Sequence, residues 1–395
     1  YDYASNLWFG FSSPILSNAG TKKGLPISCF LNYVPDSRGG LSSHYDENIW
    51  LASNGGGIGG YWGDVRSDGT STSHGSKSTG SIPFMRVVDS QMLAFNQGTT
   101  RRGSYACYMD VSHPEIEEFL FMRKSSGGDA NRKCLNLHHG INISDDFMTA
   151  VSKNIEWKLI DPHSKKIRKS INARELWRLI LETRHETGEP YLHFVDTSNK
   201  HLPEAQKKLG LSVKQSNLCS EITLPTDEDR TAVCCLSSVN LAKYDEWSTS
   251  PTFIPDMVRM LDNVLEHFIQ ATYDFSYDYK GDVLDMKVKE GMEGFTKAGY
   301  SAYRERSLGL GAMGFHTYLQ KLNVPFEGPI ATGQNLKMFR QIKELANKTS
   351  MELAEERGEA PDMEGTGMRN AHLLAVAPNA TSSIICGGTS PSIEP

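Results

Sequence analysis

The sequence predicts an α/β fold, and two features of the chain carry that prediction. Short apolar runs typical of strands alternate with long segments in which apolar residues recur every three or four positions, the pattern of amphipathic helices. The 395 residues contain no linker rich in Ser, Gly or Pro that would divide the chain cleanly. Strands alternating with helices in one large core indicate either a helix-covered sheet or a barrel.

The amino-terminal part begins with an apolar run at residues 27–34, which reads as a buried strand. Two segments that follow, 54–69 and 96–105, are rich in glycine and polar side chains, so we interpret them as loops outside the core. Long helices are predicted at 173–186, 254–275 and 335–358. Strand-like pieces lie between them, at 191–195, 216–224 and 307–315.

The composition narrows the class of protein. Hydrophobic residues make up 38%, charged residues 22%, and the net charge is −6, so nothing favours a nucleic acid or an anionic membrane as partner. The chain has no apolar run of about 20 residues and no signal-peptide pattern, and we expect a cytoplasmic protein. Both ends look cut, because the chain starts at Tyr1 and stops at PSIEP, so we expect an internal piece of a longer protein.

The seven cysteines are an odd number scattered along the chain, which favours reduced thiols over a disulfide scaffold. No CxxC or HExxH motif is present, and we expect no metal site.

The stretch QSNLCSEITLP, residues 215–225, places Asn217, Cys219 and Glu221 at alternate positions. If the segment is extended, the three side chains share one face. Cys219 alone would usually be a buried small hydrophobe, but a carboxylate beside it needs a partner or a role and is a candidate general base. Cys29 and the pair Cys234 and Cys235 could join Cys219 in a barrel interior, with two thiols supplying electrons by forming a disulfide.

Three weaker motifs suit anions. GGGIGG at 55–60 could cradle a phosphate, but it lacks the GK[ST] of a P-loop, and taken alone it is better explained as a tight turn. Arg66, Arg101 and Arg102 could bind phosphates, although solvated arginines are commoner. VAPNATSSII at 376–385 resembles a helix amino terminus, where exposed N–H groups favour a phosphate and where a plain N-cap is the simpler alternative.

Taken in order, these motifs resemble one family. SPILSNAGTKKGLPISCF, GGIGGYWGDVR, NLCSEITLPT, CCLSSVNL, PNATSS and a closing IEP are similar to the catalytic large subunit of ribonucleoside-diphosphate reductase of the class I type, from Ser13 to Pro395. The pair NLCxE and CxLSSxNL is the specific part of this resemblance. The resemblance implies a ten-stranded α/β barrel of the ribonucleotide reductase and glycyl-radical type. The whole chain, 1–395, would be the central catalytic barrel domain, with effector-binding loops within 33–105 and a finger loop around 215–225.

The resemblance also implies the chemistry. Cys219 would carry the thiyl radical that removes the ribose 3′-hydrogen, Glu221 would take the 3′-hydroxyl proton, and Asn217 would position the ribose. Cys29 and Cys234 would be the redox pair; Cys234 is preferred to Cys235 on its spacing to LSSxNL. The expected substrate contacts are Ser13, Ser28, Gly57, Asn379, Ala380, Thr381, Ser382 and Ser383. The expected effector contacts are Asp36, Ser37 and Arg66, with Gln97 and Arg101 in the loop that relays effector identity to the substrate base.

The implied cofactors and partners come from outside the chain. The radical would come from a metal-containing small subunit, electrons from thioredoxin or glutaredoxin, and control from ATP or a deoxynucleoside triphosphate, in a homodimer of large subunits. The sequence contains no Tyr-Tyr pair, no carboxy-terminal CxxC and no ATP cone, so we expect this piece alone to turn over poorly. An adenosylcobalamin-dependent reductase and a catalytically inactive nucleotide-binding fragment are the alternatives; a glycyl-radical enzyme is less favoured.

Overall fold

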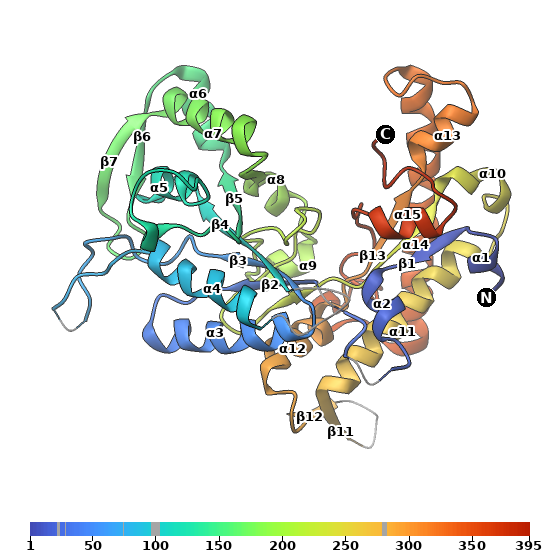
Figure 1. Ribbon diagram of the computed structural model, residues 1–395. Coiled ribbons are helices and arrows are strands. Elements are labelled where there is room, and N and C mark those ends of the chain that lie inside the picture. Colours follow the sequence, from blue (N-terminus) through green and yellow to red (C-terminus); the bar gives the residue numbers. More distant parts are fainter. Residues whose placement is uncertain (22–23, 28, 74, 96–102, 279–282) are drawn as a thin grey trace. The chain divides into compact units, whose positions relative to one another are not determined.

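The computed structural model describes residues 1–21, 24–27, 29–73, 75–95, 103–278 and 283–395 (Figure 1). Ser28, Gln97 and Arg101, three of the expected site residues, lie outside the described residues. The chain forms two compact units. The first unit contains Tyr1–Ser28, Pro203–Leu209 and Val233–Pro395, and the second contains Cys29–Leu202 and Gly210–Ala232.

The second unit is built on a parallel sheet. Strands β3, β4, β5 and β8 follow β2 in spatial order, each parallel to its neighbour, and β9 lies beyond β2 where the chain passes from one unit to the other. Parallel neighbours need crossover connections, which explains the alternation of strands and helices in the sequence. The elements are β2 (Cys29–Tyr33), α3 (Arg38–Ser53), β3 (Gly57–Tyr61), α4 (Ile82–Ala94), β4 (Ser104–Asp110), α5 (Ile116–Phe121), η1 (Ala130–Arg132), β5 (His138–Ile143), α6 (Asp145–Lys153), β6 (Glu156–Ile160), β7 (Ile167–Asn172), α7 (Ala173–Thr187), β8 (Tyr191–Phe194), α8 (Val195–Lys200) and β9 (Ala232–Val233).

The first unit contains a smaller sheet of order β1-β10-β13, with β1 antiparallel and β13 parallel to β10, and a hairpin of β11 and β12. Long helices α11 and α14 pack against each other in this unit (Figure 1). Its elements are α1 (Asp2–Ser5), β1 (Phe9–Phe11), α2 (Ser13–Asn18), α9 (Glu204–Lys208), β10 (Leu236–Asn240), η2 (Leu241–Lys243), α10 (Tyr244–Trp247), α11 (Phe253–Thr272), β11 (Tyr273–Tyr277), β12 (Val283–Val288), η3 (Glu293–Phe295), α12 (Thr296–Glu305), β13 (Gly309–Met313), α13 (Phe315–Lys321), α14 (Pro329–Arg357), η4 (Pro361–Met363) and α15 (Ala380–Ile385).

The predicted helices are confirmed, with shifted ends that have local causes. Helix α7 begins where the Asn172 side chain accepts hydrogen bonds from two backbone N–H groups, and it ends at Gly188 in the left-handed conformation. Helix α11 stops at Thr272, because Tyr273 already pairs with Val288 in the β11–β12 hairpin. Helix α14 starts six residues earlier than predicted, with Pro329 in its first turn. The strands predicted at 27–34, 191–195 and 307–315 correspond to β2, β8 and β13.

The prediction of a loop at residues 54–69 is wrong for part of that segment. Its central residues are not a loop but strand β3, and all five are buried between β2 and β4. A Cβ built on Gly59 would lie 2.3 Å from the carbonyl oxygen of Ser216, and one on Gly60 would lie 1.6 Å from the Tyr105 hydroxyl. The glycines are therefore needed so that other groups can lie directly against the strand, which a composition argument cannot distinguish from a turn. The predicted loop 96–105 is likewise a strand over its described end, since β4 begins at Ser104.

No helix within the described residues combines the length and the apolar character needed to cross a membrane.

We predict that Gly59→Ala destabilises the protein, because the added methyl group would collide with the backbone at Ser216. The expected loss is about 1–3 kcal/mol in the free energy of unfolding, measured by denaturant titration. Gly39→Ala is the matched control, since Gly39 lies in helix α3 with no atom within 4 Å of the added Cβ. Equal stability of the two variants would contradict the close approach at Gly59.

Candidate functional site

The finger loop, residues 215–225, belongs to the second unit, and its two ends lie next to each other. Val213 and Pro225 form an antiparallel bridge at its base. The chain then turns at its tip, where Ser220 has a φ of 66° and its backbone N–H donates to the Asn217 carbonyl at 3.2 Å. The prediction of an extended strand at 216–224 is therefore wrong. Cys219 lies on a turn, and the shared face inferred from alternate spacing does not apply.

Asn217 holds the loop to the sheet through its side chain. Its amide nitrogen donates to the Cys29 Sγ at 3.1 Å, and its amide oxygen accepts from the backbone N–H groups of Glu221 and Ile222, each at 3.0 Å. The Asn217 side chain is fully buried, so these bonds satisfy polar atoms that water does not reach. The structure thus brings together Asn217 and Cys29, and it places Gly57 beside Cys29 in the β2–β3 register.

Two further residues anchor the loop, and sequence reasoning missed both. The buried Gln215 amide donates to the carbonyl oxygens of Asn32 and Gly59 at 2.9 and 3.1 Å and accepts from the Thr226 hydroxyl at 2.9 Å. The Tyr108 hydroxyl donates to the Asn217 carbonyl at 2.7 Å. Gln215 opens the motif that drew attention to the loop, but nothing in the sequence connects Tyr108 with it.

The reactive groups of the loop differ in exposure. Cys219 is exposed at the tip, and Glu221 is half-buried. The pKa of Tyr191 is raised by burial and by the nearby charges of Glu189 and Cys219, so the Tyr191 ring on β8 lies within electrostatic range of the tip. The loop tip therefore carries a thiol and a carboxyl group on a backbone that hydrogen bonds attach to the sheet.

In the first unit, the neighbouring thiols of Cys234 and Cys235 are both buried and lie directly before strand β10. The Cys235 Sγ donates to the Leu261 carbonyl on helix α11 at 3.4 Å, and burial raises the pKa of that thiol far above its ordinary value. Cys235 is thereby held as a neutral thiol against the helix. None of the seven cysteines, all within the described part of the chain, is in a disulfide.

The predicted helix amino terminus at 376–385 is confirmed as α15, with Asn379 as its N-cap. The Asn379 amide donates to the carbonyl oxygens of Ala377 and Ala312 at 2.7 and 3.3 Å, which ties the turn to β13. The Ser382 hydroxyl donates to the Phe11 carbonyl at 3.1 Å.

Strand pairing brings further expected residues to the same edge of the smaller sheet. Phe11 pairs with Ser237, so Ser13 after β1 and Cys234 before β10 leave the sheet at one edge. Ser383 is buried, while Ala380 and Thr381 are exposed in the first turn of α15. The first unit thus gathers its expected substrate contacts around one small sheet.

The expected effector contacts lie near one another in the second unit. Arg66 Nε and the Asp36 carboxylate form an ion pair at 2.9 Å, and the Arg66 guanidinium also donates to the Asp36 carbonyl at 3.3 Å. The Ser37 hydroxyl accepts from the Gly40 N–H at 2.9 Å and caps helix α3. His163, which the sequence reasoning did not select, lies with its Nδ1 3.2 Å from the Asp36 carboxylate.

The chain resembles known proteins over most or all of its length. The sequence model of "Ribonucleotide reductase, barrel domain" matches residues 27–366. The chain belongs to the ribonucleotide reductase family. It is 51% identical over its full length to the putative ribonucleoside-diphosphate reductase large subunit of Frog virus 3 (isolate Goorha) and covers 65% of that protein. It is 43% identical to the ribonucleoside-diphosphate reductase large subunit of Invertebrate iridescent virus 3, again over the full chain and 67% of the relative.

A solved relative agrees in fold. The Actinobacillus ureae class Id ribonucleotide reductase alpha subunit superposes with a TM-score of 0.84 at 33% identity, covering all of this chain and 67% of the other. The chain thus spans about two thirds of the length of these relatives. The predicted α/β fold class of the ribonucleotide reductase family is confirmed. The described strands fall into sheets of six, three, two and two, and closure of ten strands into a barrel stays a prediction.

A buried histidine supports the base of the finger loop. His193 Nδ1 donates to the Asn142 amide oxygen at 2.8 Å, and the Asn142 amide nitrogen donates to the Lys214 carbonyl at 2.7 Å. Burial lowers the pKa of His193 from 6.5 to about 4. In the unfolded chain the His193 imidazole is protonated as the pH falls below about 6.5, whereas in the folded protein it stays neutral until about pH 4.

We predict that His193 makes the protein acid-sensitive: its contribution to stability is complete above pH 6.5 and is lost as the pH falls toward 4. Between pH 7 and 5 the free energy of unfolding should fall by about 2 kcal/mol from this group, and His193→Gln should remove that part of the pH dependence. Denaturant titration at both pH values measures it, with exposed His201→Gln as control. An unchanged pH dependence in His193→Gln would contradict the assignment.

Proposed function

We propose that the protein containing this chain reduces ribonucleoside diphosphates to deoxyribonucleoside diphosphates by a thiyl-radical mechanism. The observation that carries the proposal is the hydrogen bond from the Asn217 amide to the Cys29 Sγ. It joins the loop that bears Cys219 and Glu221 to the strand that bears one of the two proposed redox thiols. Membership of the family and the names of the viral relatives support the same activity.

Each proposed step uses one of these groups. A thiyl radical at Cys219 takes the 3′-hydrogen of the ribose, and the Glu221 carboxylate takes the 3′-hydroxyl proton. The 2′-hydroxyl then leaves as water after receiving a proton from the redox pair. Cys29 and Cys234 supply two electrons and become a disulfide, and the Cys219 thiol returns its hydrogen to C3′. The sum is one ribonucleotide and one dithiol converted to one deoxyribonucleotide, one disulfide and one water.

The environment of Cys235 favours Cys234 as the redox partner of Cys29. Cys235 already donates its proton to the Leu261 carbonyl, and burial opposes formation of its thiolate. Disulfide formation proceeds through a thiolate, so Cys235 is poorly suited to the redox role. We therefore assign the pair to Cys29 and Cys234.

Binding of the nucleotide would use the first turn of α15. Its backbone N–H groups and the hydroxyls of Thr381, Ser382 and Ser383 suit a diphosphate, with Ser13, Ser28 and Gly57 as further contacts. Asp36, Ser37 and Arg66 would hold an allosteric deoxynucleoside triphosphate or ATP, and Gln97 and Arg101 would relay its identity to the substrate base. In this proposal the Asp36–Arg66 ion pair orients Arg66 before the effector arrives.

The radical would come from a separate metal-containing small subunit, and the disulfide would be reduced by thioredoxin or glutaredoxin. The viral relatives are named as large subunits and the solved relative as an alpha subunit, which favours this arrangement over an adenosylcobalamin-dependent enzyme. We also propose that two large subunits form the homodimer. Activity that required adenosylcobalamin and no second subunit would contradict the class I assignment.

We predict that Cys219→Ser abolishes ribonucleoside diphosphate reduction by the full-length protein supplied with its radical source and a dithiol. Glu221→Gln should lower kcat by about 10²–10⁴-fold, because the 3′-hydroxyl proton loses its acceptor. Cys235→Ser is the matched control, since the hydroxyl can keep the bond to Leu261 and the activity should stay within a few-fold of wild type. Wild-type turnover in Cys219→Ser would remove the radical assignment.

A further inference from the structure

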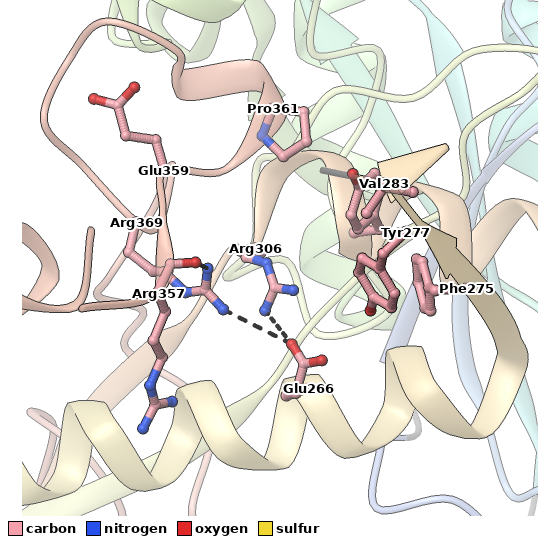
Figure 2. Close-up of a pocket in the computed structure, with 10 residues that line it drawn as sticks. Glu266, Phe275, Tyr277, Val283, Arg306, Arg357, Glu359, Pro361 and Arg369 are labelled. Atoms are coloured by element: carbon pink, nitrogen blue, oxygen red, sulfur yellow. Dashed lines mark hydrogen bonds and ion pairs between the residues drawn. The ribbon is translucent and has the colours of Figure 1, made fainter. Parts of the chain in front are cut away.

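A cavity of about 530 Å³ lies within the first unit, apart from every residue assigned above. Figure 2 shows Glu266 rising from helix α11 toward two arginines, with the aromatic rings of the β11–β12 hairpin across the cavity. The described lining combines three guanidinium groups with three aromatic rings. A volume of this size matches small-molecule sites, which pair aromatic walls with a few placed polar groups.

The guanidinium groups outnumber the carboxylates that they contact. Arg306 and Arg369 share Glu266, with N–O distances of 2.6 and 3.8 Å. Arg369 and Arg357 share Asp262, at 3.3 and 2.8 Å. Arg306 and Arg369 are almost completely buried, which makes this excess of positive charge costly.

Glu359, the second carboxylate of the cavity lining, does not balance this excess by contact. Glu359 accepts from the backbone N–H groups of Gly365 and Gly367, and Figure 2 shows its carboxylate directed away from Glu266. Burial and the neighbouring charge of Arg306 lower the pKa of Arg369, the direction expected where cations are crowded. An added anion would relieve this crowding.

The opposite wall offers aromatic faces. The rings of Phe275 and Tyr277 are stacked, with centroids 6.2 Å apart and an interplanar angle of 26°, and Tyr303 lies 5.5 Å from Phe275. Tyr277 is 56% exposed, although large aromatic side chains usually bury most of their surface. A planar ligand could stack on this ring and remove its exposed face from water.

We propose that this cavity binds a nucleoside phosphate, with its base stacked on Tyr277 and its phosphate paired with Arg306 and Arg369, the two arginines that meet at Glu266 (Figure 2). Guanidinium groups suit phosphate oxygens because their donors form a fixed fork. The site would be separate from the substrate and effector sites proposed above, and it does not depend on the assigned catalytic roles. Binding there would add a nucleotide contact that the reductase chemistry does not require.

Photoaffinity labelling with 8-azido-ATP tests this proposal on the full-length protein. We expect labelled peptides that contain residues 273–277 or 296–306, distinct from peptides of the second unit. Tyr277→Ala should lower this labelling about 5-fold or more, in line with the loss of one base-stacking contact. Arg306→Gln should lower it as well, because a neutral amide replaces a phosphate partner.

Leu284→Ala is the matched control, since Leu284 is exposed on the same hairpin and does not line the cavity. It should leave the labelling unchanged, and circular dichroism should show that all three variants keep the fold. Labelling confined to other peptides, or cavity labelling that neither Tyr277→Ala nor Arg306→Gln reduces in folded protein, would overturn the proposal. Loss of reductase activity in Cys219→Ser has no bearing on this outcome, so the two proposals fail independently.

Discussion

One buried amide sets the geometry of the finger loop. The Asn217 side chain donates to the Cys29 Sγ and accepts from two N–H groups of the loop itself, so a single group fixes both the shape of the tip and its distance from strand β2. Because the amide is shielded from water, losing any one partner would leave a polar atom unsatisfied, at a cost of about 1–3 kcal/mol. Cys219 is exposed, yet its backbone is held in place, because Asn217, two residues earlier, is anchored to the sheet.

The sheet beneath the loop is shaped for this contact. The loop backbone lies against Gly59, where no Cβ fits, and Gln215 and Tyr108 supply hydrogen bonds from buried positions. The close approach explains why a strand at the centre of the sheet contains three glycines among its five residues, a composition that usually weakens strands. Firm support below the loop is the arrangement that the proposed radical and proton-transfer chemistry would need, since small displacements of the reacting atoms reduce rates strongly.

The sequence predicted those parts of the structure that depend on local periodicity. Helices α7, α11 and α14 follow from apolar spacing, and α15 follows from the small polar residues after Pro378. It failed at two other places. Strand β3 was predicted as a loop, because Gly59 is required by a contact with Ser216, which is far away in the sequence. The finger tip was predicted as a strand, because a turn held by side-chain and backbone bonds to Asn217 leaves no mark on apolar periodicity. The candidate residues were identified from motifs that occur in a fixed order along the chain. The anchoring role of Gln215, and the contacts of Tyr108 and His163, could be identified only from the structure. The charged and aromatic cavity near Glu266 had no sequence signal, because its walls come from separate helices and a hairpin.

The central claim is that the Asn217-bound thiol of Cys29 and the thiol of Cys234 act as one redox pair. Its most direct test is a single turnover, without external dithiol, by the full-length enzyme with any carboxy-terminal cysteine pair replaced by Ser, followed by mass-spectrometric mapping of disulfides. The account predicts one new disulfide per chain, joining Cys29 to Cys234, in an amount equal to the deoxyribonucleotide formed. A disulfide that joins Cys29 to Cys235 instead, or product formed with both Cys29 and Cys234 still reduced, would contradict it.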